Sequence, residues 1–256
     1  MKVVIIGSGN VATVLGRKIK AAGHEVLQVV SRNLEHAKVL GEILDCEITN
    51  DFNNTSSDGE LYLVALSDTA LEDLHMYLRL NHSLVVHTAG SVTKNVLQKI
   101  STNYGVLYPL QSLRTGMEQI PEIPLLADGN TPESLTLIED FAYTISGKVH
   151  YANDEQRLHL HLAAVVVSNF TNHLFTLAND YCKKTGADFN LLLSLIKETV
   201  NRLQFYSPDA VQTGPAVRND RDTTKKHLKM LEDHPELQKI YEEMTESIWD
   251  YYKSIQ

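Results

Sequence analysis

The sequence predicts an α/β protein: a doubly wound, mostly parallel sheet of the Rossmann type, followed by an all-helical second domain. Three observations carry this prediction. Short, nearly all-apolar runs alternate with helical patterns up to about residue 150, as expected for strands covered on both faces. A glycine-rich turn joins the first such run to the first helical pattern. No strand-like run follows residue 151, so we expect domains at 1–151 and 152–256.

The alternating patterns predict the strands and helices of the first domain. We expect strands at Lys2–Ile6, Glu25–Val30, Leu61–Leu66, Leu84–His87, Gly105–Tyr108, Ile123–Ala127 and Lys148–Tyr151. Helical patterns lie between most of them, for example at Val11–Ala22 and Leu34–Leu44. Ligands of such sheets bind at the carboxyl ends of the strands, so the residues that follow each strand are candidates for a site.

The second domain contains only helical patterns. They cover Glu155–Lys184, Phe189–Phe205, Thr223–Glu232 and Glu236–Lys253. We expect Gly186 to end the first helix, Asp188 to cap the second and Pro235 to lie in the first turn of the last. The span 158–179 has no formal charge but carries several histidine, serine and asparagine residues, which predicts a buried helix rather than a membrane span.

The composition excludes several classes of protein. The chain of 256 residues has 32 acidic and 23 basic residues, a formal net charge of −9, which argues against nucleic-acid binding. No cluster of lysine and arginine suggests a membrane surface. Cys46 and Cys182 form no CxxC pair, so a reducing cytoplasm is expected.

A glycine-rich fingerprint follows the first strand. Residues 7–12 read Gly-Ser-Gly-Asn-Val-Ala, which is GxGxxA between a strand and a helix. In this pattern Gly7 allows the tight turn, Gly9 admits a pyrophosphate to the backbone, and Ala12 allows close helix packing. The helix N-terminus offers free N–H groups to phosphates. We therefore expect a dinucleotide to bind at Gly7, Ser8, Gly9, Asn10, Val11 and Ala12, the alternative being a turn without a ligand.

The end of the second strand indicates which dinucleotide binds. A site for NAD usually has a carboxylate there, but this chain has Ser31, Arg32 and Asn33. A serine and an arginine suit the 2′-phosphate of NADP, although Arg32 as a solvated loop residue is the alternative. After the next strand come Ala65, Leu66, Ser67 and Asp68, which we expect beside the cofactor. Ser67 and Asp68 either contact the ribose or cap the next helix.

Polar residues without charge mark the first helix of the second domain. Projected at 100° per residue, His161, Ser168, Asn169 and Asn172 lie on one side of this helix. Such a stripe indicates an enclosed position against a cleft or another subunit, where its groups bind a ligand or make structural hydrogen bonds. We expect His161, Ser168 and Asn169 to be catalytic and Asn172 to contact substrate.

Further site residues come from other segments. His87, at a strand end, and His161 are both candidates to move a proton, because imidazole titrates near neutral pH. Arg218, in the Thr213–Asp220 loop, is expected to bind a carboxylate or phosphate of the substrate or to form a surface salt bridge. No metal is expected, because His159 and His161 are 200° apart on a helix and cannot chelate together.

These motifs together resemble a known family. The N-terminal half resembles the NADP-binding domains of pyrroline-5-carboxylate reductases and 6-phosphogluconate-dehydrogenase-like enzymes. The whole chain is similar to NADP oxidoreductases in which a helical domain follows the Rossmann domain. Besides residues 7–12 and 31–33, the motifs are VVHTAGSVTKNVL (85–97), YPLQSL (108–113), HLAAVVVSNFTNHL (161–174) and TGPAVRND (213–220). The resemblance implies a homodimer through the helical domain.

One departure concerns the acid–base residues. Related hydroxyacid dehydrogenases have a lysine and, one turn later, an asparagine in the first helix of the second domain. No lysine lies between Arg157 and Asp180 here, so Asn169 would keep the asparagine role while His161 or a water replaces the lysine.

We therefore expect a cytoplasmic, NADP-dependent oxidoreductase that acts on a small molecule at the interdomain cleft. A non-catalytic NADP-binding sensor is the alternative. A methyltransferase is disfavoured because no acid ends the second strand.

Overall fold

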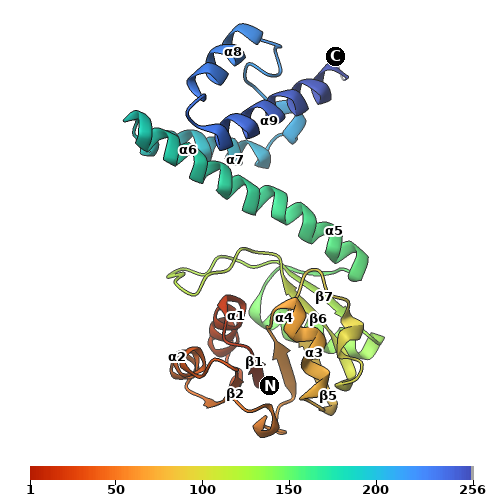
Figure 1. The fold of residues 1–256 in the computed structure, drawn as a ribbon. Helices are drawn as coiled ribbons and strands as arrows, with labels where there is room; N and C mark the ends of the chain where they lie inside the picture. The colour runs from red at the N-terminus through yellow and green to blue at the C-terminus, as the bar shows by residue number, and fades with distance from the viewer. Residues whose placement is uncertain (255–256) are drawn as a thin grey trace. The chain divides into compact units, whose positions relative to one another are not determined.

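An eight-stranded sheet forms the centre of the N-terminal part of the protein (Figure 1). The computed structural model describes residues 1–254, and the chain divides into two compact units, Met1–Ser168 and Asn169–Gln256. The last strand ends at Tyr151, where the strand pattern of the sequence also ends. The domain boundary at 151/152 stays a prediction, because the compact units divide 17 residues later.

The sheet of the first unit has the order β3-β2-β1-β4-β5-β6-β7-β8. The strands are β1 (Lys2–Ile6), β2 (Glu25–Val30), β3 (Glu47–Thr49), β4 (Leu61–Val64), β5 (Asn81–His87), β6 (Ser101–Pro109), β7 (Leu125–Gly129) and β8 (Val149–Tyr151). All neighbouring pairs are parallel except β6 and β7. The predicted doubly wound, mostly parallel α/β fold is confirmed.

Two features of the sheet differ from the sequence-based expectation. The short edge strand β3 was not expected, because its three residues, Glu-Ile-Thr, show no apolar run. Strand β7 runs antiparallel to β6, because residues 110–124 join the two strands without the crossover helix that a parallel pair requires.

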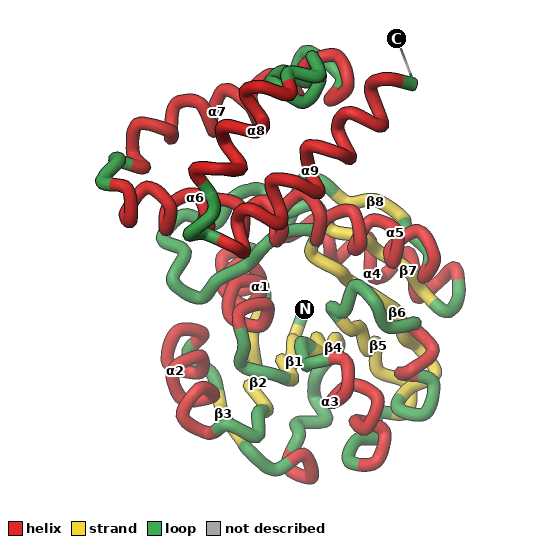
Figure 2. The backbone as a smooth tube through the Cα atoms, turned by 45° about the horizontal axis from the view of Figure 1, so that its top comes forward, coloured by secondary structure: helices red, strands yellow, loops and turns green. Residues whose placement is uncertain are grey.

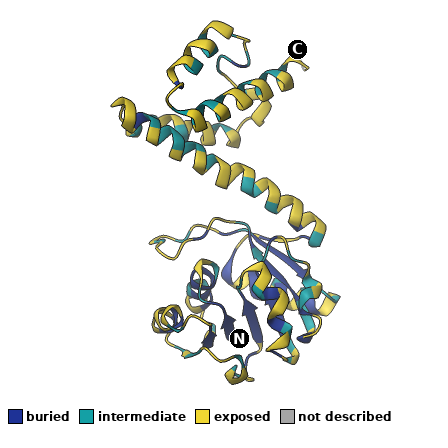
Figure 3. Ribbon diagram, viewed as in Figure 1, coloured by how far each residue is buried: buried dark blue, intermediate teal, exposed yellow. Residues whose placement is uncertain are grey.

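Helices cover both faces of the sheet (Figure 2). They are α1 (Asn10–Ala21), α2 (Leu34–Leu44), α3 (Asp68–Asp73) and α4 (Pro132–Ile145), while α5 (Asp154–Ala164) follows β8 and contributes no residue to the core on either face. Because successive strand residues point to opposite faces, Ile5 packs with residues of α1, α2 and α4, while Ile6 packs with residues of α3. Figure 3 shows the strands of this unit as buried.

The second unit is all helical within the described residues. Its helices are α6 (Thr171–Thr185), α7 (Leu193–Asn201), α8 (Arg221–Met230) and α9 (Pro235–Lys253). The predicted end signals are confirmed. Gly186 ends α6 in a left-handed conformation with φ 76°, and the Asp188 carboxylate accepts from the Asn190 amide. Pro235 lies in the first turn of α9.

The uncharged helical span is not buried, contrary to expectation. Leu162, Val167 and Phe170 are 63%, 71% and 58% exposed, and Figure 3 shows exposed residues along this stretch. A π-helical turn at Val165–Phe170 separates α5 from α6. No helix among the described residues combines the length and apolarity that a membrane crossing requires.

Candidate functional site

The turn after β1 has the geometry of a phosphate-binding loop. Gly7 has φ 118°, and a Cβ there would lie 2.2 Å from the Ala65 carbonyl oxygen, so only glycine fits. Nothing lies within 4 Å of the position that a Cβ on Gly9 would take. Gly9 is the N-cap of α1 and provides no side-chain acceptor, and the first turn carries no acidic residue. These features fit a pyrophosphate, because the N–H groups at the start of α1 need an anionic or polar acceptor.

The other residues of this loop have distinct surroundings. The Ser8 hydroxyl is 2.7 Å from that of Ser31, and Ala12 is fully buried against the sheet. The side-chain oxygen of Asn10 accepts from the Thr115 amide at 2.9 Å. This bond ties the 110–124 segment to the loop, so Asn10 offers a ligand its backbone rather than this oxygen.

The end of β2 carries the residues expected to select the cofactor. Ser31 is buried and bonded to Ser8, while Arg32 is exposed and forms no ion pair with any described residue. A guanidinium in this position is available to an anionic group. The Asn33 side chain instead caps α2 by accepting from the His36 amide at 3.0 Å. The Asn33 side chain is thus engaged at the start of α2, and its part in cofactor binding stays a prediction.

The loop after β4 lies next to the glycine turn. Ala65 contacts Gly7, and its amide donates to the Ile6 carbonyl at 2.8 Å. Ala65 and Leu66 are half-buried, and Ser67 and Asp68 are exposed. Ser67 is the N-cap of α3 but makes no side-chain capping bond, and Asp68 accepts from the Ser91 hydroxyl. The hydroxyl of Ser67 is thus free for a ribose, whereas Asp68 helps to hold the loop after β5.

A tyrosine and a histidine meet at the end of β6. The Tyr108 hydroxyl and His161 Nδ1 are 3.0 Å apart, and the rings pack edge to face with centroids 5.9 Å apart. Both side chains are half-buried. Burial raises the pKa of Tyr108, against a smaller lowering by the charge of Arg157, so its hydroxyl stays protonated at neutral pH. The pair can carry a proton between the protein surface and a group bound at the strand ends.

Gly90, in the loop after β5, touches this pair. A Cβ on Gly90 would lie 2.6 Å from His161 Nδ1 and 3.0 Å from Tyr108 Cζ. Real Cβ atoms essentially never approach so closely. The backbone of this loop therefore packs directly on the two rings and fixes their position.

His87, the other proton-transfer candidate, is fully buried. Its Nδ1 accepts from the Ala89 amide at 3.1 Å, so the neutral ring carries its proton on Nε2, which has no partner in the described residues. Burial, helped by the charge of Arg157, lowers the pKa of His87 to about 4. The lowered pKa favours the neutral ring near pH 7, and a proton-transfer role for His87 stays a prediction.

The polar stripe expected on the uncharged helix does not form as projected. Ser168 and Asn169 lie in the π-helical turn, and Asn172 lies in α6. All three are exposed rather than enclosed. A π-turn accommodates an extra residue, so positions beyond it are rotated by roughly 100° from the regular projection. His161 precedes the turn and therefore does not share one face with Asn172 as predicted.

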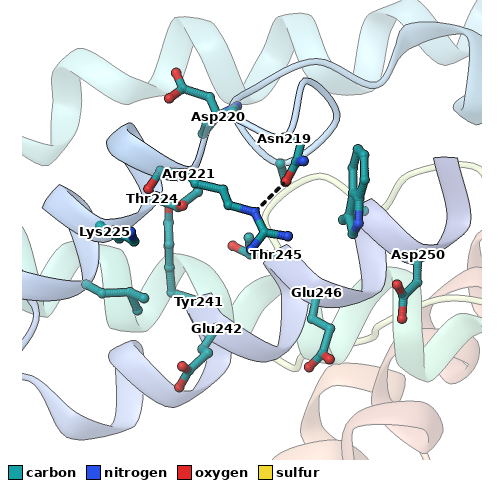
Figure 4. Close-up of a pocket in the computed structure, with 14 residues that line it drawn as sticks. Asn219, Asp220, Arg221, Thr224, Lys225, Tyr241, Glu242, Thr245, Glu246 and Asp250 are labelled. Atoms are coloured by element: carbon teal, nitrogen blue, oxygen red, sulfur yellow. Dashed lines mark hydrogen bonds between the residues drawn. The ribbon is translucent and has the colours of Figure 1, made fainter. Parts of the chain in front are cut away.

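The second unit contains a pocket of about 430 Å³ between the Thr213–Asp220 loop, α8 and α9 (Figure 4). Of the loop, Pro215, Ala216, Asn219 and Asp220 line it, but the expected Arg218 does not. Arg221 lines it instead, and Figure 4 shows its side chain reaching from α8, where Nε donates to Asn219 Oδ1 at 3.2 Å. Asp220 caps α8, accepting from the Thr223 amide at 3.0 Å.

The sequence places Tyr108 at a strand end that lines the expected site and makes His161 a catalytic candidate, but their contact and the role of Gly90 were missed. The signal available was the spacing of Asp154, Arg157 and His161, which is i, i+3 and i+7 on one face of α5. The partner of His161 lies 53 positions away, so no local pattern identifies it. Among residues 1–254, no group of three or more His, Cys, Asp or Glu side chains is placed to hold a metal ion.

Comparisons with known proteins agree with this architecture. Residues 2–90 match the family described as NADP oxidoreductase coenzyme F420-dependent, and residues 123–248 match DUF2520, a domain of unknown function. A solved structure of the putative NADP oxidoreductase BF3122 from Bacteroides fragilis is 38% identical over 97% of this chain and 98% of that chain, with a TM-score of 0.91. No curated protein matches the sequence.

More distant structures share the fold. A 1-pyrroline-5-carboxylate reductase from Streptococcus pyogenes is 16% identical over 98% of each chain, with a TM-score of 0.62. A reductive aminase from Aspergillus terreus, in complex with NADPH and ethyl levulinate, is 16% identical over 98% of this chain and 99% of that chain, with a TM-score of 0.69. Given the 38% identity to the Bacteroides fragilis protein over almost both full chains, this protein belongs to the same NADP oxidoreductase family.

Proposed function

We propose that this protein is an NADPH-dependent oxidoreductase that reduces a polarised C=N or C=O bond of a small molecule. The observation that carries the proposal is the Tyr108–His161 hydrogen bond at the carboxyl end of β6. Strands β1, β4, β5 and β6 are consecutive and parallel in the sheet, so the glycine loop after β1 and Tyr108 belong to the same edge. That edge is where open α/β sheets bind their ligands.

The cofactor would be held by local devices, because the protein has a net charge of −9 and NADPH is an anion. The free N–H groups at the start of α1 would bind the pyrophosphate over Gly9. Arg32 would pair with the 2′-phosphate, with Ser31 and Ser8 beside it. When bound, the reduced nicotinamide supplies the hydride.

The proton would come from the tyrosine–histidine pair. With its raised pKa, Tyr108 keeps its hydroxyl proton at neutral pH. When a protonated His161 donates from Nδ1 to the Tyr108 oxygen, the hydroxyl proton is free for the nitrogen or oxygen that gains negative charge as hydride arrives. His161 is half-buried and can be reprotonated from solvent. Tyr108 is thus the proton donor and His161 replaces the proton.

The second domain would complete the site and the assembly. We place the substrate in the cleft between the domains, with Asn169 orienting it and Ser168, Asn172 and Arg218 as further polar contacts. We also propose a cytoplasmic homodimer. Its support is the exposure of large apolar side chains in the helical unit, among them Leu191 and Phe205, each 77% exposed. Both cysteines are free, as expected in a reducing compartment. Light scattering after size-exclusion chromatography tests the dimer.

The test of the function combines binding and turnover. Calorimetry with NADPH and NADH should show tighter binding of NADPH, and NADPH oxidation should appear with a member of a panel of cyclic imines, keto acids and aldehydes. Tyr108→Phe and His161→Gln should remove turnover while leaving NADPH affinity within about twofold. His159→Gln is the matched control, because His159 is exposed on the same helix. Unchanged turnover in both site variants contradicts the assignment.

The sensor alternative is supported by the absence of a lysine between Arg157 and Asp180. It predicts tight NADPH binding with no oxidation across the whole panel. One confirmed substrate rejects it.

A further inference from the structure

We propose that Arg157 is a positioning residue that holds the loop after β5 against the Tyr108–His161 pair. This inference rests on the proposed function of that pair. The loop, residues 88–94, contains Gly90, whose backbone packs on both rings. A loop in this position sets the ring geometry only if it is itself held in place, and the structure shows how it is held.

The first turn of α5 binds the loop through Asp154. One carboxylate oxygen accepts from the Lys94 amide at 3.1 Å and from Arg157 Nη2 at 2.7 Å. The other accepts from the Thr93 hydroxyl at 2.6 Å. Burial alone would raise the pKa of Asp154, but the hydrogen bonds from Thr93, Arg157 and Lys94 outweigh it and lower the pKa below the ordinary value. Asp154 is therefore ionised at neutral pH and binds the loop as a carboxylate.

Arg157 reaches the same loop directly. Its Nη2 also donates to the Val92 carbonyl, so one guanidinium nitrogen joins the loop backbone to Asp154. Arg157 is only 1% exposed, an unusual position for a cation on a helix whose neighbouring side chains face solvent. Nη2 makes both bonds of the guanidinium, while Nε and Nη1 are buried without a hydrogen-bond partner among the described residues, so the bonds to Asp154 and Val92 alone tie the side chain to the loop.

The helix repeat connects this anchor to the proton-transfer pair. Asp154, Arg157 and His161 are at i, i+3 and i+7, so they form one stripe along α5. The stripe faces the 88–94 loop at its first two members and Tyr108 at its third. Fixing the loop to Asp154 and Arg157 therefore places Gly90 against His161 with the spacing that the Tyr108 bond requires.

The loop has further attachments that do not involve α5. The Thr88 amide donates to the Val64 carbonyl at 3.1 Å, and the Lys94 ammonium donates to the buried Asp128 carboxylate at 2.7 Å. These contacts maintain the general path of the loop when Arg157 is changed. Loss of Arg157 should thus displace Gly90 by a small distance rather than unfold the segment.

The first experiment needs no substrate. Histidine labelled with ¹⁵N on the ring gives a signal for His161 Nδ1, identified by its loss in His161→Gln and its shift in Tyr108→Phe at fixed pH. In Arg157→Met this signal should move toward its position in Tyr108→Phe. In Arg157→Lys the signal should stay closer to the wild-type position, because lysine keeps the positive charge. It should not coincide with that position, because lysine cannot form the same set of bonds.

A second pair of variants changes Thr93, which binds the same carboxylate. Thr93 is exposed, so its replacement disturbs folding less than replacement of the buried Arg157. Thr93→Val removes the hydroxyl that binds Asp154 and should move the signal in the same direction, whereas Thr93→Ser keeps the bond and should not. Where a substrate is found, Arg157→Met should lower kcat at least tenfold with NADPH affinity within twofold. A wild-type His161 signal in both Arg157→Met and Thr93→Val overturns the positioning role, and does so whether or not the protein turns over a substrate.

Discussion

Replacing Gly90 by alanine is the sharpest test of the site geometry. The new Cβ would lie 2.6 Å from His161 Nδ1 and 2.7 Å from its Cγ, whereas ordinary contacts begin near 3.4 Å. The imidazole must therefore retreat by about 0.8 Å unless the loop yields. The Tyr108–His161 bond is 3.0 Å long, and a retreat along its axis takes it beyond 3.5 Å, where it no longer counts as a hydrogen bond.

The expected loss follows from this displacement. A misplacement of about 1 Å in a catalytic group lowers turnover by roughly 100-fold. We therefore expect kcat of Gly90→Ala to fall by about that factor while NADPH affinity, set at the glycine loop, stays within twofold. Stopped-flow oxidation of NADPH measures the first and calorimetry the second. The His161 ring signal gives the same answer without a substrate.

Gly116→Ala is the matched control, because nothing lies within 4 Å of the position that its Cβ would take. It should keep wild-type turnover, melting temperature and His161 signal. If Gly90→Ala also keeps all three, either the loop yields freely or the pair does not carry the proton. A wild-type kcat together with a displaced ring signal refutes the chemical role of the pair and leaves the geometry standing.

The remaining predictions concern the cofactor site and the buried histidine. Arg32→Ala should weaken NADPH about 10- to 100-fold more than NADH, since a hydrogen bond to a charged group contributes about 1.5–3 kcal/mol, and equal losses in calorimetry would reject the 2′-phosphate role. Gly7→Ala should abolish NADPH binding and lower the melting temperature, because its Cβ would meet the Ala65 carbonyl oxygen at 2.2 Å. Gly23→Ala is the control, because Gly23 has φ 82° but open space around the Cβ position. It should show only the effect of backbone strain. His87 has a pKa of about 4 in the folded state against 6.5 for the ordinary group, so falling pH protonates the unfolded chain first and stability is lost between pH 6.5 and 4. At pH 5 this loss is about 2 kcal/mol, and urea unfolding of His87→Gln should show a shallower pH dependence. A slope equal to that of the wild type would contradict the lowered pKa.

The fold was predictable where its signals are local. Strands β1 and β2 and helix α2 have the bounds expected from the sequence. Each has a clear apolar pattern, and α2 also has its capping asparagine. Strand β3 has three residues and no such pattern, because its place at the sheet edge depends on backbone pairing with β2 rather than on side-chain burial. The antiparallel direction of β7 likewise could not be predicted. It depends on the path of the connection from β6, which contains no helix, and no single segment of the sequence encodes that path.

The candidate site, like the fold, was predictable only where its signal is local. The glycine loop is predictable, because one chain segment supplies the turn, the open space and the helix N-terminus. The polar stripe was not, because a projection at 100° per residue assumes regular hydrogen bonding through Val165–Phe170. The π-turn there breaks that assumption, and it coincides with the division of the chain into compact units at Ser168 and Asn169. Interruptions of this kind are frequent at functional sites, so Asn169 keeps its interest in spite of the failed projection.

The buried Arg157 shows how one charge connects these observations. Its position between Asp154 and His161 on α5 was visible in the sequence, but only its burial distinguishes it from an ordinary surface arginine. Burial is the main cause of the lowered pKa of His87, and the charge of Arg157 adds to it; the same guanidinium favours ionised Asp154 and so strengthens the anchor of the loop. Of the two histidines proposed from the sequence, His87 is fully buried and His161 is half-buried, and His161 is the one whose ring the anchored loop positions.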